Sequence, residues 1–329
     1  MKFATFVGCH KTPRLGIVDV EQGAVLGLSA ASEQVHERVD RDFADMLSLI
    51  DAAGPGLERA AELARSWPPE ASEDLDEVKL LAPLPIPRQI RDCMAFEEHV
   101  RNSRRQVELR TGRPQRVPEV WYERPVYFKC NRFNVIGHDA DVIWPPYSDW
   151  MDYELELACV IGRTGKDISS ANAPAHVFGF TIFNDFSARD VQFEEMKAGL
   201  GPAKGKDFDT GNAFGPWIVT LDELGDPHAL AMEARVNGER WGGGNSHAMH
   251  HTFWDIIAYV SQAETLFAGE IIGSGTVGTG SAHELGRRAR AEPCGRARDR
   301  EDRRFAQSHR QAVVSRSFAR GREAPGRCR

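Results

Sequence analysis

The sequence predicts an α+β protein rich in β-strand, and three observations support that fold class. Short runs of β-branched and aromatic residues, separated by Gly, Pro and Asn, recur between residues 80 and 286. Asn237-Gly238 separates two such runs and is a strong signal for a two-residue hairpin. The stretch 253–266 carries apolar residues on one stripe and is the clearest helix. We therefore expect a single mixed β-sandwich or closed roll with a few helices.

The elements are expected in two structural units. Residues 1–76 begin with short strand-like runs, followed by helical stretches near 36–50 and 56–66, and they predict a small N-terminal α+β domain. The segment 67–76, with two adjacent prolines and several acids, is predicted to be a linker. The larger unit, residues 77–286, is predicted to be the β-rich body, with strands at 126–129, 141–144, 155–161, 177–183, 217–220 and 232–236.

The composition is that of an ordinary soluble globular protein, with 41% hydrophobic and 27% charged residues. The chain has no apolar stretch long enough for a signal peptide or a membrane span, so no membrane partner is expected. Its cysteines show no CxxC pair and no regular spacing, which argues against a disulfide framework. We therefore expect a cytoplasmic protein.

Charge is distributed unevenly along the chain. The net charge of −7 combines a tail, 287–329, that carries 14 arginines and 5 acids with a strongly acidic remainder. An acidic body is a poor nucleic-acid surface, so no nucleic-acid partner is expected, but it suits a protein that gathers carboxylates around a cation. The tail is predicted to be disordered. Its arginine-rich, lysine-free composition indicates either a frameshift that replaced the native C-terminus or a genuine basic arm for RNA or an acidic partner.

The first candidate for chemistry is the pair Glu154 and Glu156. Side chains of a strand alternate between faces, so these two carboxylates should point the same way. Ala158 and Val160 continue that face with apolar residues, which indicates that the acids border a buried region. Two desolvated carboxylates need a cation to stay ionised, and oxygen ligands favour Mg²⁺, Mn²⁺ or Ca²⁺ over zinc. The alternative is a half-exposed strand with a solvated acidic face.

Two further segments carry chemical groups. Asp185 follows an apolar run, so it is either a ligand at the end of a buried strand or a helix N-cap. The Gly-rich segment 199–210 lacks the spacing of a nucleotide-binding loop, and its Lys206 is either a group for a substrate anion or a solvated loop lysine. The histidines His247, His250 and His251 have no cysteine or HExxH motif nearby, so loop histidines are favoured over a zinc site.

Five motifs occur in order between residues 80 and 286: DYELELACVIG, FGFTIFNDFSARDVQ, GKDFDTGNAFGPWIVT, ARVNGERW and IIGSGTVGTG. Together they resemble the successive motifs of the fumarylacetoacetate hydrolase family. The resemblance implies a β-rich roll, a Mg²⁺ or Mn²⁺ cofactor, a small 2-oxo acid as substrate and a homodimer. It stops near Gly286, after which the chain is arginine-rich.

The resemblance also implies roles for single residues. His99, in the polar segment EEHVRNSRR, would be the general base, although a helix-surface histidine is the alternative. The metal carboxylates would be Asp92, Glu154, Glu156 and Asp185. The substrate or oxyanion contacts would be Arg189, Gln192, Lys206 and Thr276, with Thr210 near the metal. Where some branches have a glutamate three residues after the histidine, this chain has Asn102, and the first glutamate after the GT-containing loop is Glu284, so the sequence does not identify the acid that orients His99.

The predicted function is metal-dependent hydrolysis of a carbon–carbon bond in a small 2,4-dioxo acid, such as an acylpyruvate or fumarylacetoacetate. The metal would polarise the carbonyl, His99 would activate water, and Lys206 with Arg189 would bind negative charge. Alternatives within the family are a 2-oxo acid decarboxylase, hydratase or isomerase, because the same metal enolate serves all of them. The non-enzyme alternative is an inactive truncated relative or a binding protein.

Overall fold

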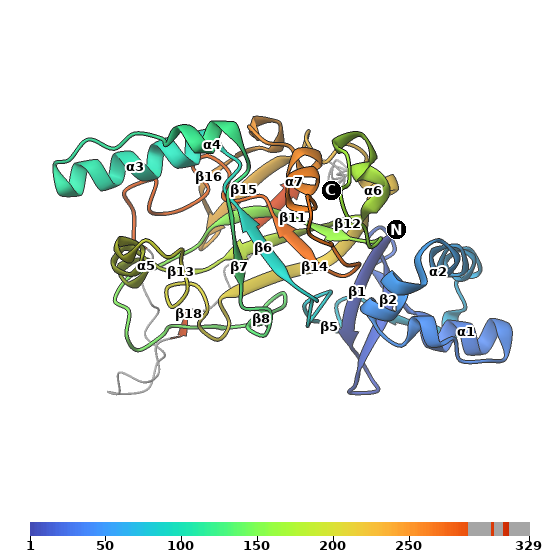
Figure 1. Cartoon of the computed structure of the whole chain (residues 1–329). Coiled ribbons are helices and arrows are strands. Elements are labelled where there is room, and N and C mark those ends of the chain that lie inside the picture. Colours follow the sequence, from blue (N-terminus) through green and yellow to red (C-terminus); the bar gives the residue numbers. More distant parts are fainter. Residues whose placement is uncertain (289–303, 306–311, 316–329) are drawn as a thin grey trace, which may run out of the picture.

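A computed structural model describes residues 1–288, 304–305 and 312–315 of the chain. Within these residues, one mixed sheet of twelve strands runs through the molecule (Figure 1). In pairing order its strands are β4 (Ser72–Asp74), β3 (Ala24–Gly27), β2 (Pro13–Asp19), β1 (Lys2–Val7), β14 (Asn212–Thr220), β12 (Val177–Asp185), β11 (Leu155–Ile161), β17 (Ile271–Gly273), β6 (Ile90–Cys93) and β7 (Tyr127–Cys130), with β5 (Lys79–Leu80) paired to β1 and β8 (Val135–Ile136) paired to β14.

The N-terminal strands belong to this same sheet. Strand β1 pairs antiparallel with β14, with Phe3 opposite Ile218, so the hairpin strands β1 to β3 extend the sheet of the β-rich body. Helices α1 (Leu28–His36) and α2 (Met46–Ser66) lie beside β1 and β2 and share an apolar core with them (Figure 1). The proposed boundary between residues 76 and 77 falls between β4 and β5.

Two local predictions for this N-terminal region are wrong. The helix expected near 36–50 is wrong over 37–45, because α1 ends at His36 and α2 starts only where the Asp45 side chain caps the amide of Ser48; the helix expected near 56–66 is present as the part of α2 that follows its kink at Ala53. The expected linker 67–76 contains strand β4, which pairs with β3. A partner strand overrides the local composition here, because pairing with β3 satisfies backbone groups that a linker would leave to water.

The β-rich body agrees with its predicted fold class, and all six expected strands are present. They correspond to β7, β9 (Val142–Ile143), β11, β12, β14 and β15 (Ala231–Val236). The expected hairpin joins β15 to β16 (Glu239–Asn245), and both turn residues, Asn237 and Gly238, have positive φ. Helix α7 (Phe253–Val260) begins as expected with a capping box formed by Thr252 and Asp255, but it ends six residues early.

Several elements lie outside the main sheet. The helices are α3 (Glu97–Thr111), α4 (Glu119–Glu123), α5 (Arg189–Glu195) and α6 (Leu221–Leu224). Strand β10 (Met151–Asp152) pairs with β13 (Ser187–Ala188). In the tail, β18 (Arg304–Phe305) pairs with β9, and β19 (Ala312–Ser315) pairs with β15. These two strands lie in the segment predicted to be disordered, which stays a prediction for the tail as a whole. The other tail residues, from 289 onward, lie outside those described.

Strand β11 lies in the centre of the sheet and is buried along its whole length. One set of its alternating side chains, including Leu157 and Cys159, packs in the core that contains α7. The other set, Ala158 and Val160, packs in the core shared with α1 and α2. Glu156 belongs to this second set, so its carboxylate is buried, as the apolar continuation of its face predicted. None of the helices in the described residues is long and apolar enough to cross a membrane.

Candidate metal centre and active site

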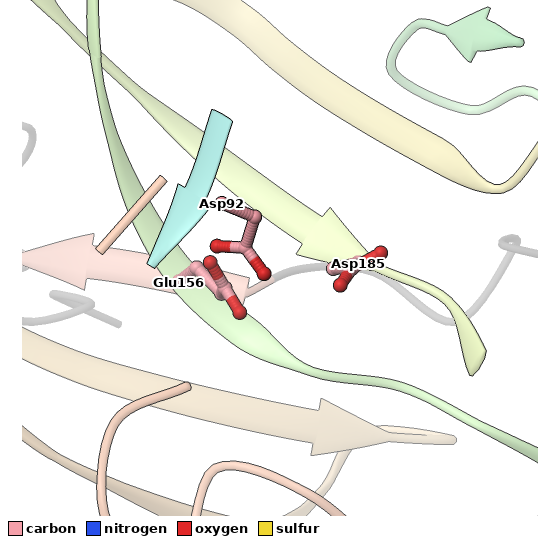
Figure 2. A group of neighbouring side chains, drawn as sticks. All are labelled: Asp92, Glu156 and Asp185. Carbon is pink, nitrogen blue, oxygen red and sulfur yellow. The ribbon is translucent and has the colours of Figure 1, made fainter. Parts of the chain in front are cut away.

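Three carboxylates from neighbouring strands meet beside the centre of the sheet. Asp92 lies in β6, Glu156 in β11 and Asp185 at the end of β12, and one oxygen from each lies within 4.8 Å of the others (Figure 2). Between β6 and β11 runs β17, whose Gly273 pairs with Asp92 on one side and Ala158 on the other. A Cβ on Gly273 would lie 2.5 Å from the Asp92 Oδ1 atom, so the close approach of the acids requires glycine at this position.

The surroundings of this acid trio fit a divalent cation. All three side chains are buried. Burial raises the pKa of Glu156 and Asp185 well above the usual range, and neighbouring carboxylates raise both further. Burial also raises the pKa of Asp92, although its hydrogen bond with Glu156 opposes the shift. Among the described residues, Asp92 Oδ1 and Asp185 Oδ1 have no hydrogen-bond partner. A hard cation such as Mg²⁺ or Mn²⁺ would provide those oxygens with a partner and keep the carboxylates ionised.

Glu154 is oriented differently from the acid trio. Its carboxylate lies 2.7 Å from Arg189 Nη2 and accepts a hydrogen bond from Lys206 Nζ. Burial opposes its ionisation, but the cations of Arg189 and Lys206 prevail and hold the pKa of Glu154 well below its usual range. Glu154 therefore faces Arg189 and Lys206 in this structure. It is linked to the acid trio through Lys206, which also donates to Asp185.

Lys206 is a buried residue in a fixed loop, with 2% of its surface exposed, which excludes the solvated-lysine interpretation. The Glu195 carboxylate, at the end of α5, accepts hydrogen bonds from three backbone amides of this loop, those of residues 203, 204 and 205. The Asn134 amide group donates to the Phe208 carbonyl on the other side, at 3.0 Å. These contacts place an ammonium group between two carboxylates at the rim of the trio.

Arg189 begins helix α5 and connects three of the site's polar groups. Its Nε donates to Asp152 Oδ2 at 2.8 Å, its Nη1 to Gln192 Oε1 at 3.0 Å, and its Nη2 to Glu154. The Thr276 hydroxyl donates to Glu156 Oε1 at 3.3 Å. Arg189, Gln192 and Thr276 are thus brought to the site that the sequence proposed for them. Thr210 instead accepts a hydrogen bond from the Ile143 amide.

His99 lies on α3 with 7% of its surface exposed, so the interpretation as a helix-surface histidine is wrong. Its Nδ1 lies 2.9 Å from Glu284 Oε2 and its Nε2 lies 3.8 Å from Glu154 Oε1. Burial favours the neutral imidazole, but the Glu284 carboxylate and then Glu154 raise the pKa of His99 overall. A histidine held by an acid at one ring nitrogen and facing the site with the other is the arrangement of a general base.

Glu284 is the acid that the sequence did not identify. It accepts hydrogen bonds from the backbone amides of Thr279 and Ser281, at 2.9 and 3.1 Å, from the Ser281 hydroxyl and from the Asn102 side chain. These donors, together with His99, hold the pKa of Glu284 below its usual value although burial opposes ionisation. Asn102, which departs from the glutamate of other branches, therefore positions the acid instead of supplying it.

Two of the histidines at 247–251 contact residues of helix α4. His250 Nε2 lies 3.2 Å from the Tyr122 carbonyl, and His251 Nε2 lies 3.0 Å from the Trp121 carbonyl. Both rings contact the Trp121 side chain. These histidines attach their loop to α4, in agreement with the preference for loop histidines over zinc ligands.

A β-rich protein that gathers buried carboxylates beside a lysine, an arginine and a His–Glu pair has the architecture of an oxygen-ligand metal site with its own acid–base group. The family profile described as "Fumarylacetoacetate (FAA) hydrolase C-terminal" matches residues 89–314. The chain belongs to the fumarylacetoacetate hydrolase family. The match extends past Gly286, where the resemblance was expected to stop, and it includes β18 and all but the last residue of β19.

Similar sequences carry the name of one activity. The human mitochondrial oxaloacetate tautomerase FAHD2B is 33% identical over 280 residues, which cover 84% of this chain and 81% of the relative. Oxaloacetate tautomerase YisK of Bacillus subtilis is 31% identical over 294 residues, which cover 84% of this chain and 88% of that protein. A shorter match to human oxaloacetate tautomerase FAHD2A, 42% identical over 154 residues, covers 48% of that relative.

Solved structures with the same fold include hydrolases. A fumarylacetoacetate hydrolase from Exiguobacterium antarcticum aligns with a TM-score of 0.63 and 28% identity, over 86% of this chain and 89% of its own. A maleylpyruvate hydrolase from Sphingobium sp. SYK-6, in complex with manganese(II) and pyruvate, aligns with a TM-score of 0.63 and 25% identity, over 85% and 90%. The family thus includes both named tautomerases and named hydrolases.

Proposed function

We propose that this protein is a divalent-metal-dependent tautomerase that interconverts the keto and enol forms of a small 2-oxo dicarboxylic acid of the oxaloacetate type. The observation that carries the proposal is the His99–Glu284 pair facing a carboxylate cluster, in a chain whose relatives over more than four fifths of its length are named oxaloacetate tautomerases. This favours the isomerase alternative of the sequence analysis over its main prediction of carbon–carbon hydrolysis.

Asp92, Glu156 and Asp185 would hold Mg²⁺ or Mn²⁺. Glu154 shares Lys206 with Asp185, so it would become a further ligand if the ion replaced Lys206 as its partner. When bound, the ion supplies Lewis-acid polarisation of the 2-oxo group. The burial of the acid trio and its oxygen ligands support this assignment, and Ca²⁺ shares the same ligand preference.

The remaining chemistry rests on proton movement at His99. Its Nε2 takes a proton from the carbon next to the keto group, while Glu284 stabilises the imidazolium that forms. Lys206 and Arg189 supply positive charge for the enolate oxygen and the substrate carboxylate. Return of one proton to the oxygen completes the enol, so a C–H bond is exchanged for an O–H bond and no water is consumed.

A second candidate is hydrolysis of an acylpyruvate, which the structural likeness to the maleylpyruvate hydrolase favours. It needs the same groups plus a water molecule placed for attack by His99. Decarboxylation and hydration have no comparable support among the reported relatives. A homodimer and a cytoplasmic location stay predictions, and light scattering of the purified protein tests the first.

The deciding experiment compares the two reactions in one preparation. Keto–enol exchange of oxaloacetate is followed by the ultraviolet absorbance of the enol, with Mn²⁺ and after removal of metal by a chelator. Pyruvate release from acylpyruvates is measured by chromatography. Metal-dependent exchange without pyruvate release supports the tautomerase. Pyruvate release without faster exchange would show that the protein is a hydrolase instead. If a folded, Mn²⁺-binding protein catalyses neither reaction, the interpretation as a non-catalytic binding protein would replace both.

A further inference from the structure

One buried carboxylate beside the site has no role in the function proposed above. Asp152 lies at the end of β10, two residues before Glu154, and only 1% of its surface is exposed. It is not part of the acid trio, and its oxygens are occupied by protein donors. Its contacts therefore have to be explained by something other than metal binding.

The Asp152 carboxylate joins two parts of the site that are distant in sequence. Its Oδ2 accepts from Arg189 Nε at 2.8 Å and lies 2.7 Å from Arg189 Nη2. Its Oδ1 accepts from the backbone amide of Ala282 at 2.9 Å, and its Oδ2 from that of His283 at 3.1 Å. The arginine and the 281–284 turn are thus both attached to one side chain.

The turn attached in this way carries Glu284, the acid that contacts His99. The two amides bound by Asp152 immediately precede Glu284, and Glu284 in turn binds the amides of Thr279 and Ser281. Ser281 also forms a bridge to the backbone of Glu154. Asp152 and Glu284 therefore both accept hydrogen bonds from backbone amides of the same turn. We infer that the position of the Glu284 carboxylate depends on both sets of contacts.

We infer that Asp152 is a positioning residue, which sets Arg189 for substrate and the Glu284 turn for His99 through one carboxylate. The inference rests on the proposed function. Without the Asp152 charge, Arg189 keeps Glu154 as its main anionic partner, and two turn amides lose their acceptor. Displacement of a reacting group by about 1 Å reduces rates by about 100-fold, so a position held this way affects catalysis without touching substrate.

The test variant is Asp152→Asn, which keeps the shape but offers one acceptor oxygen and no charge. The matched control is Glu73→Gln, because Glu73 also holds an arginine, Arg14, and a backbone amide, that of Cys9 at 2.8 Å, far from the site.

We expect Asp152→Asn to lower kcat/KM for oxaloacetate about 100-fold, with a raised KM and a shifted pH profile. Mn²⁺ affinity, measured by calorimetry, should change less than about threefold, because the acid trio is untouched. Glu73→Gln should change none of these.

A readout independent of turnover is the ¹⁵N NMR spectrum of histidine-labelled protein, in which the His99 signals are assigned from a His99→Gln variant. Asp152→Asn should shift the His99 ring signals, and the shift should disappear in a Glu284→Gln background if Asp152 acts through Glu284. Unchanged His99 signals and an unchanged pH profile would overturn the inference.

Two failures can be distinguished. If the wild-type protein shows no tautomerase activity, the proposed function fails, yet the NMR comparison still tests the link from Asp152 to His99. If Asp152→Asn does not fold, Asp152→Glu replaces it, since it keeps the charge and moves the oxygens by one methylene. Failure of both to fold, where Glu73→Gln folds, would assign Asp152 to stability and overturn the positioning role.

Discussion

The two ends of the twelve-stranded sheet bury different kinds of side chain. At the N-terminal end, β1 to β3 bury apolar residues under α1 and α2, and the Glu73 carboxylate stays near the surface with Arg14 as its partner. Toward the other end, seven carboxylates are buried within the described residues, namely Asp92, Asp152, Glu154, Glu156, Asp185, Glu270 and Glu284. Arg91 pairs with Glu270, and within the described residues Arg189, Lys206 and His99 are the cationic or titratable basic groups that contact the other buried carboxylates.

From this difference we expect the N-terminal end to stabilise the fold and the site end to lower its stability as long as no cation is bound. Buried carboxylates without enough positive charge either take up protons or raise the free energy of the folded state. The high pKa values of Glu156 and Asp185 are the direct result. The four predictions below test this contrast between the ends.

The largest expected effect is the loss of metal from the acid trio. Glu156→Gln should reduce Mn²⁺ affinity below detection by calorimetry and lower tautomerase activity about 1000-fold, because Lewis-acid stabilisation amounts to several kcal/mol. Glu154→Gln should weaken Mn²⁺ binding only about tenfold if Glu154 faces Arg189 and Lys206 in the resting protein. Equal loss in both variants would instead assign Glu154 to the metal shell on the same footing as the trio.

The next effect concerns the base. Glu284→Gln should lower kcat about 100-fold, because it removes the charge that orients His99 and stabilises its protonated form. Mn²⁺ binding should stay within a few-fold of wild type, since Glu284 has no contact with the acid trio among its recorded partners. A parallel loss of Mn²⁺ affinity would show that the His99–Glu284 pair and the acid trio are coupled.

Metal binding should stabilise the folded protein measurably. At a Mn²⁺ concentration 100 times the dissociation constant, the free energy of unfolding should rise by about 2.7 kcal/mol, and thermal unfolding records the shift. In metal-free protein, Glu156→Gln should raise stability by about 1 kcal/mol, because a neutral amide is less costly to bury than a carboxylate. A destabilised metal-free Glu156→Gln would contradict the contrast between the two ends.

The smallest effect lies at the N-terminal end. Burial opposes ionisation of Glu73, but the Cys9 amide and Arg14 prevail and lower its pKa. Its stabilisation is therefore present above about pH 4.5, the usual value of the group, and is lost as the pH falls through the lower folded-state value. Glu73→Gln should reduce the free energy of unfolding by about 1 kcal/mol at pH 7 and by less near pH 3, as denaturant titrations at both values would measure.

The strands and the burial of Glu156 could be predicted from the sequence because their signals are local, whereas Asp92 is assigned only through the resemblance to the family. Alternation along β11 places Glu156 on the same face as Ala158 and Val160, and runs of apolar residues mark β11 and β12. Strand β4 could not be predicted, since SED has no strand composition and forms only beside β3.

The partner of His99 could not be predicted because it depends on a turn that reverses the chain. Thr279 has a φ of 63°, and Glu284 folds back onto the amides of Thr279 and Ser281. The orientation of Glu154 likewise depends on Arg189 and Lys206, which lie 35 and 52 residues further along. Sequence spacing does not encode such contacts, whereas family motifs indicate which residues take part.

The pairing of β1 with β14 has a consequence for synthesis of the protein. Lys2 and Phe3 pair with Val219 and Ile218, so β1 leaves the ribosome more than 200 residues before this partner strand. At typical translation rates this delay is roughly 10 to 40 s. During that time β1 can pair with β2 and, at Phe6 and Val7, with β5, but the part of its edge at Lys2 and Phe3 stays open to neighbouring chains. The nascent N-terminal hairpin is therefore the segment where we expect chaperones to bind and aggregation to begin.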